Sequence, residues 1–331
     1  MDRTLLAIDL VARVGATAAG STVQVAAATS QDVDFIDTWC RASGNSVLAV
    51  LPDSVEVYRG SLADPTAALP PERLPGYRLW MYTNFHCNLA CDYCCVSSSP
   101  KASPRELSAE TVAEVVRQAT ETGMREIYLT GGEPFMSREI GAIVDACVAA
   151  APTVMLTNGM LFRGARLRLL EAMPREGLVL QISVDSATPD VHDGHRGSGS
   201  WVKAVDGIRI ARQLGFRVRI AATVSTGSTA DEHALVDLCA ELNVPGEDMV
   251  VRRVAAEGCA TDGIVITRES VVPEVCVTAE GVYWHPVAAT NPTMRVSESI
   301  FPLAKSVAAM TEEFVGYRRR GEVLAASFPC A

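Results

Sequence analysis

The stretch "SAETVAEVVRQATETGMREIYLTGGEP", residues 108–134, places a helical pattern directly before a short apolar strand. In its first half, apolar side chains recur at intervals of three and four residues, which is typical of a helix with one buried face. "EIYLTGGE" (126–133) is rich in β-branched and aromatic residues and ends in glycines, which predicts a strand followed by a tight loop. A helix that leads into such a strand is the repeating unit of a parallel sheet.

The same alternation continues on both sides of this stretch. Before it, "YRLWMYTNF" (77–85) predicts a first strand. After it come four further predicted strands, each preceded by a predicted helix: "TVMLTNG" (153–159), "LVLQISVDS" (178–186), "RVRIAATVS" (217–225) and "DMVVRRVA" (248–255). The strand count is six, fewer than the eight of a closed barrel. We therefore expect an α/β fold, a partial (βα)6 TIM-like barrel over residues 77–255.

Functional residues of such folds lie where the strands end. In parallel α/β folds, ligands bind in the loops at the carboxyl ends of the strands. This rule brings the cysteine-rich stretch "FHCNLACDYCC" (85–95), the "GGEP" loop (131–134) and the "TNG" loop (157–159) to one rim of the barrel.

Cys87, Cys91 and Cys94 follow the first predicted strand with the spacing C-x3-C-x2-C. Thiolates are the soft ligands of iron–sulfur clusters, and three of them can hold a 4Fe–4S cube whose fourth iron stays open to another ligand. Zinc is the alternative, but a structural zinc site uses four ligands, and Cys95 directly adjoins Cys94, so the two side chains point in different directions. We expect an iron–sulfur cluster on the first three cysteines, with Cys95 packing beside it.

Four motifs on successive strand ends resemble those of the radical S-adenosylmethionine (radical SAM) superfamily: "CNLACDYC" (87–94), "LTGGEP" (129–134), "LTNG" (156–159) and "ISVDSATPDVHDGHRG" (182–197). The resemblance extends over residues 77–255 and is to the branch of anaerobic sulfatase maturases and peptide-modifying enzymes. It implies a 4Fe–4S cluster and S-adenosylmethionine (SAM) as cofactors. It also implies reductive cleavage of SAM to methionine and a 5′-deoxyadenosyl radical that abstracts hydrogen from a substrate.

The resemblance also assigns SAM-binding roles to residues of the first two motifs. Tyr93 stands where the family has an aromatic side chain close to the adenine, and Glu133 offers an acceptor for the methionine ammonium. Gly131 and Gly132 let the backbone approach a ligand, and Pro134 fixes the turn.

Three later residues complete the expected SAM site. Asn158 and Ser183 are expected to form hydrogen bonds with the ribose or the carboxylate of SAM. Arg196 resembles an arginine that pairs with the methionine carboxylate. For these three, a purely local structural role is the alternative.

Residues 256–331 lack the regular alternation, and we expect them to form a cap over the barrel mouth. "EVCVTAEGVYWHP" (274–286) predicts a hairpin, and "AKSVAAMTEEFVGYRRR" (304–320) predicts a helix. The hairpin resembles one in the C-terminal extensions called SPASM and Twitch, which carry auxiliary clusters, but His285-Pro286 stands near the position of the expected cysteine. We favour a degenerate extension without a cluster; the alternative is an auxiliary cluster on Cys259, Cys276, Cys330 and His285.

Residues 1–60 predict a small α+β two-layer domain, and the proline-rich residues 61–76 predict a linker. The segment 5–50 resembles the TusA-like sulfur-carrier family, including its "W-C-R-x-x-G" run. The persulfide cysteine of that family aligns with Met1, so either the carrier function is lost or a longer reading frame precedes this start. Cys40 is expected to be a core thiol. A peptide-binding domain is the rival interpretation, although such domains are usually winged-helix-like.

Composition limits the partners. The 331-residue chain has a net charge of −10, which argues against nucleic acid or an anionic membrane as a partner. The apolar N-terminal run is interrupted by Asp9 and Arg13 and follows no basic segment, so we expect no secretory signal, reduced cysteines and a cytoplasmic location.

The sequence leaves three classes of function open. The first is a radical SAM enzyme acting on a peptide or protein, with a flavodoxin- or ferredoxin-type electron donor as the resemblance implies. The second is a radical enzyme of small-molecule chemistry, including sulfur or selenium metabolism. The third is a non-catalytic iron–sulfur electron carrier, which the "GGEP" loop disfavours because a carrier needs no acceptor for an ammonium group.

Overall fold

The computed structural model describes residues 3–60, 66, 69–224 and 230–320. The chain divides into two compact units, and we describe each by itself. Of the described residues, the first contains 3–60, 66 and 69–74 with the short segments Glu269–Val272 and 311–320, and the second contains 75–224, 230–268 and Pro273–Met310. Most of the predicted linker, residues 61–65 and 67–68, lies outside the described residues.

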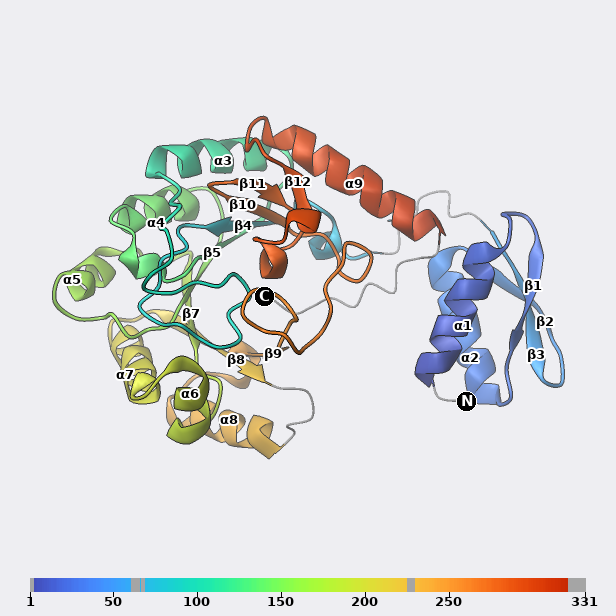
Figure 1. Cartoon of the computed structure of the whole chain (residues 1–331), viewed down its shortest axis with the longest axis horizontal. Helices are drawn as coiled ribbons and strands as arrows, with labels where there is room; N and C mark the ends of the chain where they lie inside the picture. The colour runs from blue at the N-terminus through green and yellow to red at the C-terminus, as the bar shows by residue number, and fades with distance from the viewer. Residues whose placement is uncertain (1–2, 61–65, 67–68, 225–229, 321–331) are drawn as a thin grey trace. The chain divides into compact units, whose positions relative to one another are not determined.

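Residues 3–60 form, in order, a helix, a strand, a helix and a hairpin, an α+β arrangement as expected (Figure 1). The elements are α1 (Arg3–Ala16), β1 (Thr22–Ala26), α2 (Ser30–Ser43), β2 (Ser46–Val50) and β3 (Ser54–Tyr58). The sheet has the order β1-β3-β2, and β3 is antiparallel to both neighbours. The helices and strands enclose one apolar core that contains Leu6, Leu10, Ile36, Val55 and Val57.

Cys40 belongs to this core and is fully buried, as predicted. Burial raises the pKa of its thiol to about 12. α2 ends at Gly44, whose φ of 73° is the left-handed conformation that glycine adopts most readily at helix ends. The glycine of the "W-C-R-x-x-G" run therefore has a structural explanation.

The second unit is built on the six predicted parallel strands, which are β4 (Arg78–Tyr82), β5 (Glu126–Thr130), β6 (Thr153–Thr157), β7 (Leu178–Ser183), β8 (Arg217–Val224) and β9 (Met249–Arg253). They pair in sequence order, each parallel to the next. Within the described residues β9 ends the sheet, so the barrel is partial and open, as predicted. β4 to β8 are largely buried, as is typical of parallel strands in α/β folds.

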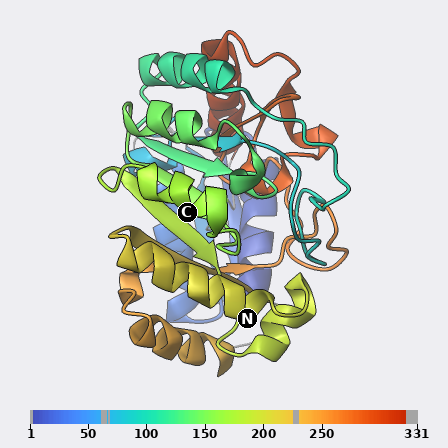
Figure 2. The same cartoon turned by 90° about the vertical axis from the view of Figure 1, so that its left-hand side faces the viewer.

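The helices that follow these strands lie in a row on one face of the sheet (Figures 1 and 2). They are α3 (Ala109–Glu121), α4 (Ile140–Val148), α5 (Gly164–Ala172), α7 (Ser200–Gln213) and α8 (Ala230–Glu241). One further helix, α6 (Pro189–Arg196), stands between β7 and α7 and was not predicted. Short 3-10 turns include Pro71–Arg73, Pro134–Met136, Gly246–Asp248, Pro286–Ala288 and Pro292–Met294.

The C-terminal segment extends the sheet. Its strands β10 (Val275–Thr278) and β11 (Gly281–Tyr283) form the predicted hairpin, followed by β12 (Arg295–Ser297) and the predicted helix α9 (Leu303–Arg320). β10 also pairs in parallel with β4, with Cys276 opposite Trp80, so the sheet has nine strands in the order β12-β11-β10-β4-β5-β6-β7-β8-β9. This segment is therefore anchored to the first barrel strand.

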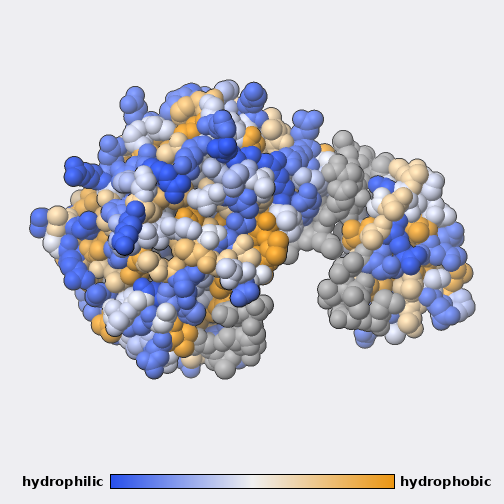
Figure 3. Space-filling model, viewed as in Figure 1, coloured by the Kyte–Doolittle hydropathy of each residue, from blue (hydrophilic) through white to orange (hydrophobic). Residues whose placement is uncertain are grey.

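The surface of this second unit is mixed in character. On the face in view, hydrophilic residues alternate with separate hydrophobic patches (Figure 3). None of the helices among the described residues combines the length and the apolar character needed to cross a membrane.

Candidate functional site

A cleft opens at the carboxyl ends of the parallel strands. Each of the six strands contributes to its wall, through Tyr82, Thr130, Leu156, Ser183, Thr223 and Arg252. The empty space, including the part open to solvent, is about 1110 Å³. The cleft lies where the fold rule places ligands in parallel α/β proteins.

Cys87, Cys91 and Cys94 all line this cleft, and Cys95 lines it with them. The backbone N–H of Leu89 donates to Cys87 Sγ at 3.4 Å, and that of Ser98 donates to Cys94 Sγ at 3.3 Å. Such N–H···S contacts stabilise thiolate ligands and tune iron–sulfur centres.

Three thiols from one loop match the donor set of a 4Fe–4S cluster with one open iron, so the residues present fit this cofactor. Burial raises the pKa of Cys87 to about 12 and that of Cys91 to about 11. The thiolate forms therefore depend on the positive charge of bound iron. Among the described residues, no group of three or more histidine, cysteine, aspartate or glutamate side chains is placed to hold a single metal ion.

Gly131 and Gly132 line the cleft and also pack against the start of the cysteine loop. A Cβ atom on Gly131 would lie 2.8 Å from the Asn84 carbonyl oxygen, and one on Gly132 would collide with the His86 carbonyl. Gly132 N donates to Asn84 O at 3.0 Å, and Glu133 N donates to His86 O at 2.9 Å. The glycines thus fix the chain immediately before Cys87, a role that the sequence did not indicate.

Glu133 and Pro134 are buried beneath the cleft and are not among its lining residues. The Glu133 carboxylate accepts hydrogen bonds from Phe135 N at 3.1 Å, from Thr157 Oγ1 at 2.8 Å and from Asn158 N at 2.8 Å. Burial raises the pKa of this carboxyl. Pro134 begins the 3-10 turn after it, as expected. Glu133 therefore links the ends of β5 and β6.

Asn158 and Ser183 line the cleft at the ends of β6 and β7. The Asn158 side chain donates to Asn88 Oδ1 at 2.8 Å and accepts from Met160 N at 3.0 Å. Because Asn88 belongs to the cysteine loop, Asn158 also positions that loop.

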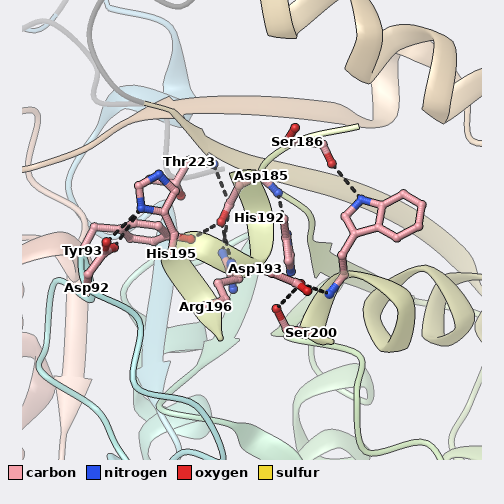
Figure 4. A network of polar contacts seen from close by, with 11 residues as sticks. Asp92, Tyr93, Asp185, Ser186, His192, Asp193, His195, Arg196, Ser200 and Thr223 are labelled. Atoms are coloured by element: carbon pink, nitrogen blue, oxygen red, sulfur yellow. Dashed lines mark hydrogen bonds and ion pairs between the residues drawn. The ribbon is translucent and has the colours of Figure 1, made fainter. Parts of the chain in front are cut away.

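Arg196 and Tyr93 meet at Asp185, the buried centre of a polar network (Figure 4). Arg196 donates to both Asp185 oxygens, at 2.6 and 3.0 Å, and Thr223 N donates to Oδ1 at 3.0 Å. The Tyr93 hydroxyl donates to Oδ2. Burial opposes ionisation of Asp185, yet the charge and hydrogen bonds of Arg196 hold the pKa of its carboxyl below the ordinary value.

The unpredicted helix α6 carries Arg196 into this network. Asp185 N donates to His192 Nδ1 at 3.1 Å, and His195 contacts the Asp92 carboxylate at 2.9 Å (Figure 4). Asp193 accepts from Gly199 N, the residue before α7, and from Ser200 Oγ and Trp201 N at the start of that helix. α6 is thereby held against β7, α7 and the cysteine loop.

Two arginines of the cleft belong to none of the sequence motifs. Arg252 and Arg253, at the end of β9, line the cleft. The sequence pattern indicates only a strand at these positions. The available signal was the pair of charged residues at the end of an otherwise apolar run.

The residues proposed for an auxiliary cluster are dispersed. Cys276 is fully buried in β10, and Cys259 is exposed. His285 is buried and its Nδ1 accepts from Val287 N; burial lowers its pKa to about 3. Cys330 lies outside the described residues. In the part of the chain that the structure describes, these candidates form no metal-binding group.

Comparison with known proteins identifies the domain. Residues 81–239 match the family model "Radical SAM superfamily". The antilisterial bacteriocin subtilosin biosynthesis protein AlbA of Bacillus subtilis (strain 168) is 33% identical over 106 residues, which are 31% of this chain and 23% of that protein. The GTP 3′,8-cyclase of Microcystis aeruginosa is 37% identical over 100 residues, which are 28% of this chain and 30% of that protein.

The fold is also found among solved structures. Native anSMEcpe with bound AdoMet and the Cp18Cys peptide has a TM-score of 0.55 at 12% identity, covering 73% of this chain and 82% of that chain. The matched regions span 23% and 30% of the lengths of these two curated relatives. The family match begins at residue 81, after residues 1–60, so the TusA-like resemblance of those residues stays a prediction. Residues 81–239 form a radical SAM domain, from a superfamily of enzymes that use a 4Fe–4S cluster and SAM.

Proposed function

We propose that this chain is a radical SAM enzyme in which Cys87, Cys91 and Cys94 hold the 4Fe–4S cluster. The observation that carries the proposal is that all three thiols line one cleft together with Gly131 and Arg196 from the other motifs. When bound, the cluster supplies the electron that cleaves SAM to methionine and a 5′-deoxyadenosyl radical, which abstracts a hydrogen atom from the substrate. A flavodoxin- or ferredoxin-type protein is the proposed electron donor.

The chain's own residues would orient SAM. Arg196 uses Nε and Nη2 for Asp185, which fixes the guanidinium plane and leaves Nη1 for the methionine carboxylate. Tyr93 lies between two of the cysteines in sequence and is held by Asp185, so its ring is oriented to pack against the adenine. Gly131 and Ser183 would supply polar contacts along the strand ends.

Glu133 is proposed as the acceptor for the methionine ammonium on the strength of the motif. Its carboxylate accepts three hydrogen bonds from the chain. An ionised carboxylate has about four acceptor sites, so one remains for the ammonium. Since Glu133 is fully buried, this contact needs SAM to reach the floor of the cleft.

A peptide or protein is the first candidate substrate. The name of AlbA refers to biosynthesis of a bacteriocin, and anSMEcpe was solved with a peptide. A small molecule is the second candidate, because the relative from Microcystis aeruginosa is named a GTP 3′,8-cyclase. We propose that residues 1–60 form a separate substrate-docking domain or a vestigial sulfur-carrier domain, whose own apolar core supports independent folding.

The cysteine assignment is tested by alanine substitution after anaerobic reconstitution. Cys87→Ala, Cys91→Ala and Cys94→Ala should each abolish the iron–sulfur absorbance near about 400 nm, because each removes a ligand. Cys95→Ala is the matched control and should keep that absorbance. Loss of the band in Cys95→Ala, with retention in any of the other three, would overturn the assignment.

A further inference from the structure

The charge of the cleft opposes the charge of the chain. The whole chain has a net charge of −10. The described residues that line the cleft include three arginines, Arg196, Arg252 and Arg253, and no aspartate or glutamate. A cleft walled by one sign of charge attracts ligands of the opposite sign.

Two of these arginines already have a carboxylate partner. Arg196 is paired with Asp185 at 2.6 Å. Arg253 is paired with Glu232 of α8 at 3.0 Å, and both of those side chains are about one-third exposed. Their positive charges are therefore largely balanced within the protein.

Arg252 differs from both. Its Nε is buried and has no hydrogen-bond partner in the described part of the chain, and no ion pair of Arg252 is formed there. Leaving a buried charged donor unpaired is costly, and native proteins rarely do so. The apolar lining residues Val254 and Val287 strengthen any electrostatic contact made at this position.

Arg252 comes from a different strand than the expected SAM contacts. Those contacts lie in the cysteine loop after β4, at the ends of β5, β6 and β7 and on α6. Arg252 lies on β9, beyond β8, opposite Thr223 in the strand register, and β9 ends the sheet.

We propose that Arg252 binds an anionic group of the substrate, a carboxylate or a phosphate, at the β9 end of the cleft. The inference rests on the proposed function, because it assigns the other end of the cleft to SAM. A guanidinium presents a planar fork that matches both kinds of oxyanion. Arg252 is thus a specificity-determining residue that selects acidic substrates, and it plays no part in SAM cleavage.

Calorimetry on the reconstituted full chain tests this. Wild type, Arg252→Gln and Arg252→Met are each titrated with SAM first. Each is then titrated with sodium pyrophosphate and, separately, with the peptide Gly-Glu-Glu, in the presence and in the absence of SAM. At least one anion should bind wild type, and its affinity should fall about tenfold or more in both variants, as expected for loss of one charge-assisted contact. Arg209→Gln, on the exposed surface of α7, is the matched control and should bind as wild type does.

The outcomes separate the alternatives. Binding of pyrophosphate alone indicates a phosphate-bearing substrate, and binding of the peptide alone indicates a carboxylate. The inference is wrong if neither anion binds wild type at about 10 mM, or if the two Arg252 variants keep the affinity. It is also wrong if the variants lose SAM affinity instead, since Arg252 would then serve SAM. Iron content and SAM binding of wild type are measured before any anion is added. If wild type fails to hold iron or SAM, the proposed function is wrong.

Discussion

Among single residues, Asp185 connects the largest number of polar groups in the network of Figure 4. It accepts from Arg196 twice, from Thr223 N and from the Tyr93 hydroxyl. Asp185 is 1% exposed and Arg196 is 10% exposed, so neither charge has much access to water. Removing one partner of such a pair leaves the other charge buried without compensation.

Asp185→Asn should therefore lower the free energy of unfolding by about 3–5 kcal/mol, the range measured for broken buried pairs. Chemical denaturation of the protein provides the measurement. Asp206→Asn is the control: its pair with Arg209 is 58% and 59% exposed, and such surface pairs contribute at most about 1 kcal/mol. Equal effects of the two substitutions would contradict the central role of Asp185.

At the element scale, the cysteine loop is positioned by the loop after β5. Gly132 approaches the His86 carbonyl so closely that no side chain fits between them. Two backbone hydrogen bonds, from Gly132 N to Asn84 O and from Glu133 N to His86 O, join the loops. The position of Cys87 thus depends on a glycine more than forty residues away in sequence.

Gly132→Ala should displace the cysteine loop and reduce the iron content after reconstitution severalfold, with a loss of stability of about 1–3 kcal/mol from overpacking. Iron analysis and thermal unfolding together measure the effect. Gly246→Ala is the control, since a Cβ atom there meets nothing within 4 Å. An iron content of Gly132→Ala equal to that of the control would remove the basis for this coupling.

We expect the stability of the protein to depend on pH through His285, in the turn after β11. Burial lowers the pKa of His285 from 6.5 to about 3. Between these two pH values the imidazole binds a proton in the unfolded chain but not in the folded protein, so acid favours unfolding. The contribution of neutral His285 to the free energy of unfolding is therefore present above about pH 6.5 and is lost as the pH falls towards 3. His285→Gln should unfold with a shallower pH dependence over that window, by denaturation at several pH values. The exposed His233→Gln should keep the wild-type slope, and a wild-type slope in both variants would contradict the assignment.

The sequence predicted those elements whose signal is local. The six parallel strands carry continuous apolar runs, and the three cysteines carry a fixed spacing. α6 was missed because "PDVHDGHR" is polar and lacks a helical apolar face. The pairing of β10 with β4 joins residues almost two hundred positions apart, and no local pattern encodes it. The burial of Glu133 and the missing partner of Arg252 are properties of tertiary packing alone.

At the scale of the whole molecule, the chain combines a radical SAM domain with a small unit that has its own core. The proposed cluster and SAM residues, from Cys87 to Arg196, all belong to the second unit. We therefore expect residues 1–60 to be dispensable for electron transfer to SAM.

A chain that begins near Leu74 should keep its iron and still cleave SAM with a strong reductant, while losing turnover of a substrate that residues 1–60 deliver. Iron analysis and chromatography of the SAM products measure both properties. Loss of the cluster on truncation would show that the first unit is integral to the barrel. A mass increase of one sulfur on Cys40 of the full chain would make that unit a working sulfur carrier, against the burial of this thiol.

SAM cleavage at a cluster held by Cys87, Cys91 and Cys94 is the reaction that we propose for this cleft. Its most direct measurement is 5′-deoxyadenosine, quantified by chromatography after anaerobic reconstitution and addition of dithionite and SAM. We expect 5′-deoxyadenosine from wild type and from Cys95→Ala, and none from Cys91→Ala. A wild-type protein that holds about four irons per chain, as one cube requires, and leaves SAM intact would contradict this proposal and identify an electron carrier instead.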